Sequence, residues 1–263
     1  MTTTTLKNHI GLRATIKQCL VFAYRGFLKI KSVPEQLVDI TLQPILFMFM
    51  FTFIFGGAVS GNFVAYLPIV IPGILAQTVI MASISTGVQL REDMDKGVFA
   101  RFKTLPIARI APLVGSMITD FFRYSIATSV TIFAGMAIGY RPAGGLGGTL
   151  LAGLLMVFVA CCMSWIFVWV ACVVRTAGTV SAFSMMILFP VTFLSNAFVK
   201  VETLPWALKI FATWNPVSHL ITAMRSLLDH ATINGDFWYT IVGALIILAI
   251  FAPLALFAYQ KRS

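Results

Sequence analysis

Six stretches of this chain are apolar over the length of a membrane span, and this feature constrains the fold more than any other. A helix needs roughly 20 apolar residues to cross about 30 Å of hydrocarbon. One stretch contains "FMFMFTFIF", residues 47–55, in which Phe at every second position would elsewhere favour a strand. An open strand in lipid would leave its backbone polar groups without partners, so we predict a helix there as well. The predicted spans cover residues 37–57, 64–87, 112–139, 148–174, 180–199 and 238–258.

The composition excludes a water-soluble globular protein. Of the 263 residues, 59% are hydrophobic and only 11% are charged. So few charged side chains cannot cover a water-facing surface, whereas a bilayer accepts an apolar exterior. We therefore predict an all-α integral membrane protein with six transmembrane helices.

Lys and Arg are distributed unequally between the two sides that these spans define. Fourteen of the nineteen lie before the first span, after the sixth, or in the loops that follow spans two and four; four lie in the other loops. The positive-inside rule places the first group, and both termini with it, in the cytoplasm. The net charge of +10 is thus a topology signal. Because basic residues and stacking aromatics are not interleaved, we expect no nucleic-acid partner.

The amino-terminal segment, residues 1–35, is predicted to be a cytoplasmic amphipathic helix that lies on the inner leaflet. Seven small or apolar residues share one helical stripe, and most of the Lys and Arg residues lie elsewhere, which is typical of interfacial helices. A basic tail that serves only topology is the alternative. The stripe contains Leu12, Ile16, Cys19, Leu20, Ala23, Phe27 and Ile30.

Between the fifth and sixth spans, Asn215-Pro216 separates two apolar pieces, 204–214 and 217–228. Pieces of roughly 10–14 residues are too short to span and suit re-entrant or interfacial helices. Pro lacks an amide donor and is well suited to begin a helix. We predict a re-entrant helix pair in the outer leaflet; an ordinary extracellular loop is the alternative.

Residues 91–109 form a charged island, with eight charged residues among nineteen. A helix over 91–105 would place on one face Met94, Val98, Phe102 and Leu105. Two i,i+4 pairs of opposite charge would support it, Arg91 with Asp95 and Glu92 with Lys96. Two interpretations remain: a short cytoplasmic helix that docks a partner, or a solvated loop whose basic residues only set the topology.

Asp120 and Arg123 are a pair of opposite charges inside the third span. Charges within a membrane span are candidates for function. Their i,i+3 spacing lets them neutralise each other, so we favour a structural ion pair over a role in cargo or proton transfer.

A binding surface for apolar molecules has to be adaptable, which aromatic and Met side chains allow because they repack easily. Spans one, two and five offer such a surface together with one amide. The candidates are Phe47, Phe51, Phe55, Gln77, Met185, Phe189 and Phe193. Each of them can equally face lipid or pack between helices.

The sequence from the island into the third span, "LREDMDKGVFARFKTLPIARIAPLVGSMITDFFR" (90–123), resembles the signature of type-2 ABC exporter permeases, especially their daunorubicin/doxorubicin-resistance branch. "NPVSHLITAMRSLL" (215–228) is similar to the Asn-Pro segment of that family. The resemblance covers essentially the whole chain, and it implies that residues 36–263 form a six-span type-2 ABC transmembrane domain.

The resemblance also implies that the island is a coupling helix received by a groove on a separate ATPase. The residues that it would assign to coupling are Arg91, Glu92, Asp93, Met94, Asp95, Lys96, Gly97, Val98, Phe99, Phe102 and Leu105. The complex would hold two ATPase subunits and a second permease copy, among lipids of a bacterial plasma (inner) membrane.

This chain is not expected to be an enzyme. It contains no G-x-x-x-x-G-K-[ST] motif, and the glycine-rich "AGGLGG" (143–148) is not followed by Lys. We expect no cofactor and no metal on this chain, and ATP with Mg on the partner subunit.

The preferred cargo is a hydrophobic or amphiphilic small molecule such as a drug, antibiotic or lipid. Permeases for lipid-linked polysaccharides share the same plan and remain an alternative. An ion-coupled secondary transporter would need ionisable residues at the midplane and usually repeat symmetry, neither of which is visible. An intramembrane enzyme would need a paired catalytic constellation, which is also missing.

Overall fold

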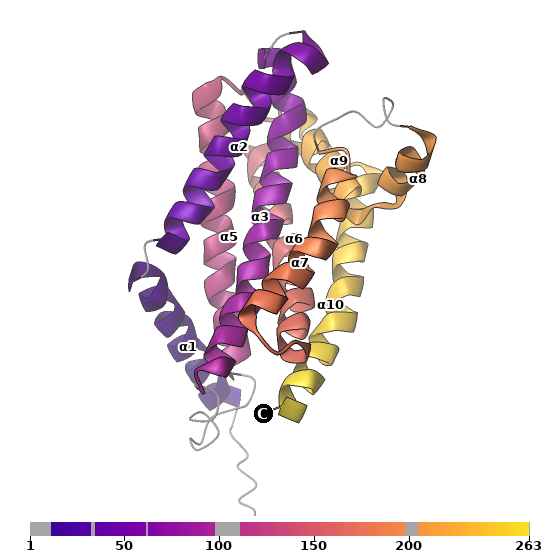
Figure 1. Ribbon diagram of the computed structural model, residues 1–263. Coiled ribbons are helices and arrows are strands. Elements are labelled where there is room, and N and C mark those ends of the chain that lie inside the picture. Colours follow the sequence, from indigo (N-terminus) through magenta and orange to yellow (C-terminus); the bar gives the residue numbers. More distant parts are fainter. Residues whose placement is uncertain (1–11, 33–34, 62, 98–110, 198–204, 263) are drawn as a thin grey trace, which may run out of the picture.

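The computed structural model describes residues 12–32, 35–61, 63–97, 111–197 and 205–262. Every regular element in these ranges is an α-helix, as the sequence predicts (Figure 1). The helices are α1 (Leu12–Ser32), α2 (Glu35–Ser60), α3 (Phe63–Asp95), α5 (Ala111–Ile138), α6 (Gly145–Val173), α7 (Ala177–Phe193), α8 (Trp206–Trp214), α9 (Pro216–His230) and α10 (Gly235–Arg262).

Four of these helices, α3, α5, α6 and α10, are long and apolar enough to cross a membrane. The apolar parts of the other two predicted spans are shorter, 41–57 in α2 and 177–193 in α7. Six apolar helices therefore lie where six spans are predicted. The boundaries agree best where a turn of Gly and Pro follows, as at the end of α5.

Two helices end at other residues than the predicted spans. The second span was expected to end at residue 87, but α3 continues without a break to Asp95. Arg91–Asp95 therefore form its last turn, and Gly97, which follows it, has a left-handed φ of +67°. The fifth span was expected to reach residue 199, but α7 ends at Phe193.

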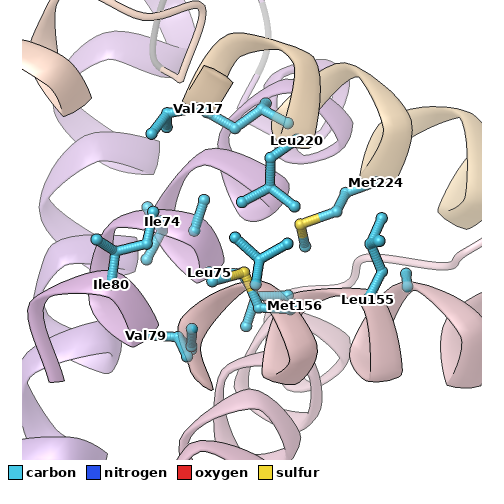
Figure 2. Packing of buried hydrophobic residues seen from close by; sticks show 14 of the residues in the cluster. Ile74, Leu75, Val79, Ile80, Leu155, Met156, Val217, Leu220 and Met224 are labelled. Carbon is cyan, nitrogen blue, oxygen red and sulfur yellow. The ribbon is translucent and has the colours of Figure 1, made fainter. Parts of the chain in front are cut away.

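α9 is a short helix that packs in the core of the bundle. Its apolar residues Val217, Leu220 and Met224 point toward α3 and α6 (Figure 2). The two predicted short pieces are thus helices α8 and α9, separated at Asn215. Both lie at the end of the bundle opposite α1 and the carboxyl end of α10 (Figure 1).

Asn215 joins the end of α7 to the beginning of α9. Its Nδ2 donates to the carbonyl of Val191 at 2.6 Å, and its Oδ1 accepts from the Val217 amide at 2.9 Å. Backbone groups at helix ends have no partner within the helix, so one amide side chain satisfies both ends. Arg225 adds a second connection, because its Nη2 donates to the carbonyls of Ile69 at 2.8 Å and Asn196 at 2.6 Å.

α1 packs on α5, and only part of its predicted stripe is covered. Cys19 and Ala23 are buried, and the Thr119 hydroxyl donates to the Ala23 carbonyl at 3.3 Å. Ile16 and Leu20 from the same stripe remain exposed, which leaves an apolar edge available to lipid.

Gly87 lets α3 approach α6 closely. A Cβ at this position would lie 2.5 Å from the Phe167 carbonyl oxygen, which belongs to the backbone and cannot rotate away. We expect Gly87→Ala to lower the melting temperature of the purified permease by about 5 °C, because overpacking costs about 1–3 kcal/mol. Gly243→Ala is the matched control, since open space surrounds Gly243 in α10. Equal melting temperatures for the two variants would contradict this account.

Candidate functional site

Asp120 and Arg123 form a buried ion pair within α5. Arg123 Nη2 lies 2.8 Å from Asp120 Oδ1. Arg123 is only 3% exposed and Asp120 only 5%. Two buried charges need additional hydrogen bonds to offset the loss of water. Thr86 and the Ala82 carbonyl supply them.

The hydroxyl of Thr86, on α3, is the centre of this polar cluster. It donates to Asp120 Oδ2 at 2.8 Å and accepts from Arg123 Nη2 at 3.0 Å. Its one proton is given to Asp120, so the Tyr124 hydroxyl, 2.9 Å away, must be the donor in the remaining bond. Arg123 also donates to the Ala82 carbonyl at 2.9 Å. The cluster Thr86, Asp120, Arg123 and Tyr124 thus ties α3 to α5.

A cavity of about 410 Å³ lies beside this cluster, between α2, α3, α5 and α7. Its lining mixes polar side chains with apolar ones. The polar residues are Gln43, Thr78, Ser85, Gln89, Glu92, Arg123 and Ser181. The apolar residues are Met81, Ala82, Ile84, Val88 and Met185. Arg123 therefore belongs both to the polar cluster and to the wall of this cavity, which we call the α2–α7 cavity.

The predicted path residues of α2 are neighbours along one face of the helix but differ in exposure. The Phe47 and Phe51 ring centroids are 6.1 Å apart, and those of Phe51 and Phe55 are 5.5 Å apart. Phe51 is buried in the core and Phe47 packs against it, whereas Phe55 is exposed. None of the three lines the α2–α7 cavity.

The candidates on α7 and α3 are also separated from one another. Met185 lines the cavity, whereas Phe189 and Phe193 stack at 4.3 Å on an exposed part of α7. Gln77 is 1% exposed, and neither atom of its amide has a hydrogen-bond partner among the described residues. The structure therefore brings only Met185 of the seven predicted path residues to the cavity.

The part of the charged island that the structure describes contacts the permease itself. Arg91 Nη1 donates to the Val174 carbonyl at 3.1 Å, and its Nε donates to Asp95 at 3.0 Å. Met94 packs against a buried cluster that includes Leu90 and Val168. Met94, which is expected on the docking face, is only partly buried by these contacts, and its part in docking stays a prediction.

The remaining island residues divide by exposure. Glu92 lines the α2–α7 cavity and pairs with the exposed Lys96 at 3.6 Å, while Asp93 is half-buried. Gly97 closes the turn through a bond from its amide to the Met94 carbonyl. Val98, Phe99, Phe102 and Leu105 lie outside the described residues.

Sequence reasoning missed Thr86 and the polar wall of the cavity. A signal was present, because Thr78, Ser85, Gln89 and Glu92 recur at the spacing of one helical face. Polar residues that share a face within an apolar helix indicate a protein-lined surface, since lipid would not satisfy them. Within the described ranges, no three His, Cys, Asp or Glu side chains gather as metal ligands would.

Comparison with known proteins assigns this architecture to a family. Residues 17–228 match the family model described as ABC-2 type transporter. The chain is 38% identical to the daunorubicin resistance ABC transporter permease protein DrrB1 of Streptomyces coeruleorubidus, over 95% of this chain and 89% of that protein. It is 25% identical to the putative transport permease ycf38 of Cyanophora paradoxa, over 94% of this chain and 89% of that one. It is also 25% identical to the probable doxorubicin resistance ABC transporter permease protein DrrC of Mycobacterium tuberculosis, over 69% of this chain and 66% of that protein. The chain therefore belongs to the ABC-2 type transporter family, as a multi-pass membrane permease that is not itself catalytic.

Proposed function

We propose that this permease exports hydrophobic or amphiphilic small molecules across the plasma membrane, driven by ATP hydrolysis on a separate subunit. Two relatives named for resistance to daunorubicin or doxorubicin support a small amphiphilic cargo. Membership of the family supports an ATPase partner. ATP and Mg would bind to that partner.

The α2–α7 cavity is suited to a small amphiphilic cargo. Its volume of about 410 Å³ falls in the range of roughly 300–1,000 Å³ that is typical of small-molecule sites. Met81 and Met185 offer adaptable apolar contacts, whereas Gln43, Gln89 and Glu92 offer polar ones. An amphiphilic molecule needs both apolar and polar contacts.

The complex would contain two permeases and two ATPases, with the cargo path between the permeases. α2 and α7 border the cavity, and both carry exposed apolar side chains such as Phe53 and Met186 that a second copy or lipid would cover. In this arrangement α1 lies on the cytoplasmic leaflet, both termini are cytoplasmic, and α8 and α9 form the re-entrant pair on the outer side. The positive-inside distribution supports that orientation.

Export of a lipid-linked polysaccharide is the second candidate function, since such permeases share this plan. The cavity lining, seven polar residues and five apolar ones, suits either cargo, so the preference for a small amphiphile rests on the two relatives named for drug resistance. An ion-coupled transporter is disfavoured by the family match.

Met185→Ala tests the proposal. We expect it to change ATP-dependent transport of two unrelated amphiphiles unequally, by about tenfold in their ratio, because lost apolar contacts affect each cargo differently. Met186→Ala is the matched control, since this neighbouring side chain is exposed and does not line the cavity. The measurement is uptake into inside-out vesicles that contain the permease and its ATPase.

The same assay distinguishes aromatic residues that contact the cargo from those that only pack between helices. Phe189 is exposed, so Phe189→Ala should also shift the ratio if the path passes along α7. Phe51 is buried, so Phe51→Ala should lower transport of both compounds by one factor. If Met185→Ala and Met186→Ala behaved alike, the cavity would not be the cargo site.

A further inference from the structure

A second cavity, of about 520 Å³, lies away from the cargo site, where α6 ends and α7 begins. Its walls are almost entirely apolar. They are formed by Trp169, Val170, Val173, Val174, Phe183 and Ile187, with Thr179 and Arg175 at one end. We call it the α6–α7 groove.

The groove has two fixed walls and an open side. Thr179, Phe183 and Ile187 recur every four residues along α7 and therefore share one face. On α6, the Trp169 ring contacts the ring of Phe251 on α10, with the two centroids 5.7 Å apart. Val173, Phe183 and Ile187 remain about half exposed. A long apolar slot of this kind fits a hydrocarbon chain that enters from the side.

Arg175 gives the groove its charge. It lies in the turn between α6 and α7, it is exposed, and it has no hydrogen-bond or ion-pair partner among the described residues. The neighbouring cation Arg91 is different, because Asp95 and the Val174 carbonyl already engage it. Arg175 is thus a cation at the mouth of an apolar groove that is free to bind an anion.

The position of this turn in the membrane identifies the anion. The turn lies toward the same end of the bundle as α1 and the carboxyl end of α10 (Figure 1), which the Lys and Arg distribution places at the cytoplasmic side. The cytoplasmic leaflet carries anionic phospholipids. Guanidinium groups bind phosphate through two parallel hydrogen bonds.

We propose that the α6–α7 groove binds one anionic phospholipid of the cytoplasmic leaflet. An acyl chain lies along Val173, Phe183 and Ile187, and the headgroup phosphate accepts hydrogen bonds from Arg175. Charge complementarity with Arg175 favours this occupant over a hydrophobic cargo, whose proposed site is the α2–α7 cavity. It also selects it over a zwitterionic lipid such as phosphatidylcholine, in which the choline ammonium already balances the charge of the phosphate.

Photo-crosslinking tests the proposal on the full-length permease in nanodiscs. Photoreactive phosphatidylglycerol is compared with phosphatidylcholine that carries the same photoreactive chain, and the labelled peptides are mapped by mass spectrometry. We expect phosphatidylglycerol to label residues 169–187 more strongly, and Arg175→Gln to reduce this labelling about fivefold, the effect of one Arg near an anionic surface. Arg141→Gln is the control, because Arg141 is an exposed arginine between α5 and α6 at the opposite end.

A second variant tests the apolar half without touching the charge. Val173→Trp should fill the groove and reduce labelling there, whereas Ile250→Trp, at an exposed position on α10, should not. Equal labelling by the two lipids, or unchanged labelling in Arg175→Gln, would overturn the proposal. A cross-link from benzoylphenylalanine at position 183 to a second permease copy, with no lipid adduct, would also overturn it. None of these results depends on transport, so failure here leaves the proposed cargo function unaffected.

Discussion

Arg123→Leu is expected to remove most of the folded permease from the membrane. The variant leaves Asp120 buried and charged, without the guanidinium that neutralises it and connects it to Thr86 and the Ala82 carbonyl. Removing one partner of a buried pair costs about 3–5 kcal/mol, a large part of the roughly 5–15 kcal/mol that stabilises a typical protein. The measurement is the amount of monodisperse permease extracted from membranes, by fluorescence-detected size-exclusion chromatography.

The double variant Asp120→Leu with Arg123→Leu is the decisive comparison. Two apolar side chains leave no unpaired charge, and Thr86 and Tyr124 can still bond to each other, so folded permease should return to near the wild-type amount. Transport by this double variant then reports on the cargo role alone, because Arg123 also lines the α2–α7 cavity. If Arg123→Leu folds normally and loses only transport, the pair acts on cargo and does not hold α3 to α5.

The second large effect is expected in the charged island, where Phe102→Asp should abolish capture of the ATPase. Burying a Phe side chain in a partner groove contributes roughly 1.5–3 kcal/mol, and the variant adds an unpaired charge there. Exposed ion pairs contribute about 0–1 kcal/mol each, so Lys103→Ala is the matched control and should change binding only slightly. Co-purification of the ATPase should therefore fall by more than tenfold in Phe102→Asp and by less than about fivefold in Lys103→Ala.

Export measured on the same preparations tests whether docking of the ATPase drives movement of the permease helices. Arg91 and Met94 contact the end of α6, so the first part of the island is packed against the bundle. Movement of the bound ATPase would therefore be passed on to α3. The Phe102→Asp permease should remain folded because the substitution changes none of the helices that the structure describes. If it kept both the ATPase and export at the wild-type level, the docking helix would be excluded, and the island would serve topology only.

Which segments are helical, and roughly how long they are, could be predicted from the amino-acid sequence alone. α5 covers 111–138 where 112–139 was predicted, because the hydrocarbon thickness requires an uninterrupted apolar run of that length. α8 and α9 are separate helices because Pro216 begins one and Asn215 caps it, which is local chemistry that a sequence displays. The close spacing of Asp120 and Arg123 also indicated an ion pair.

Where the helices end and which of their faces are buried depends on how the helices pack. α7 stops at Phe193 because Asn215, distant in sequence, takes the Val191 carbonyl. Phe51 is buried while Phe53 is exposed, although both lie in the same alternating stretch. In a bilayer the lipid-facing and core-facing residues are equally apolar, so hydrophobicity does not distinguish the two faces as it does in water. The partner of Asp120 on α3 and the polar wall of the cavity likewise depend on which helices become neighbours, and packing alone decides that.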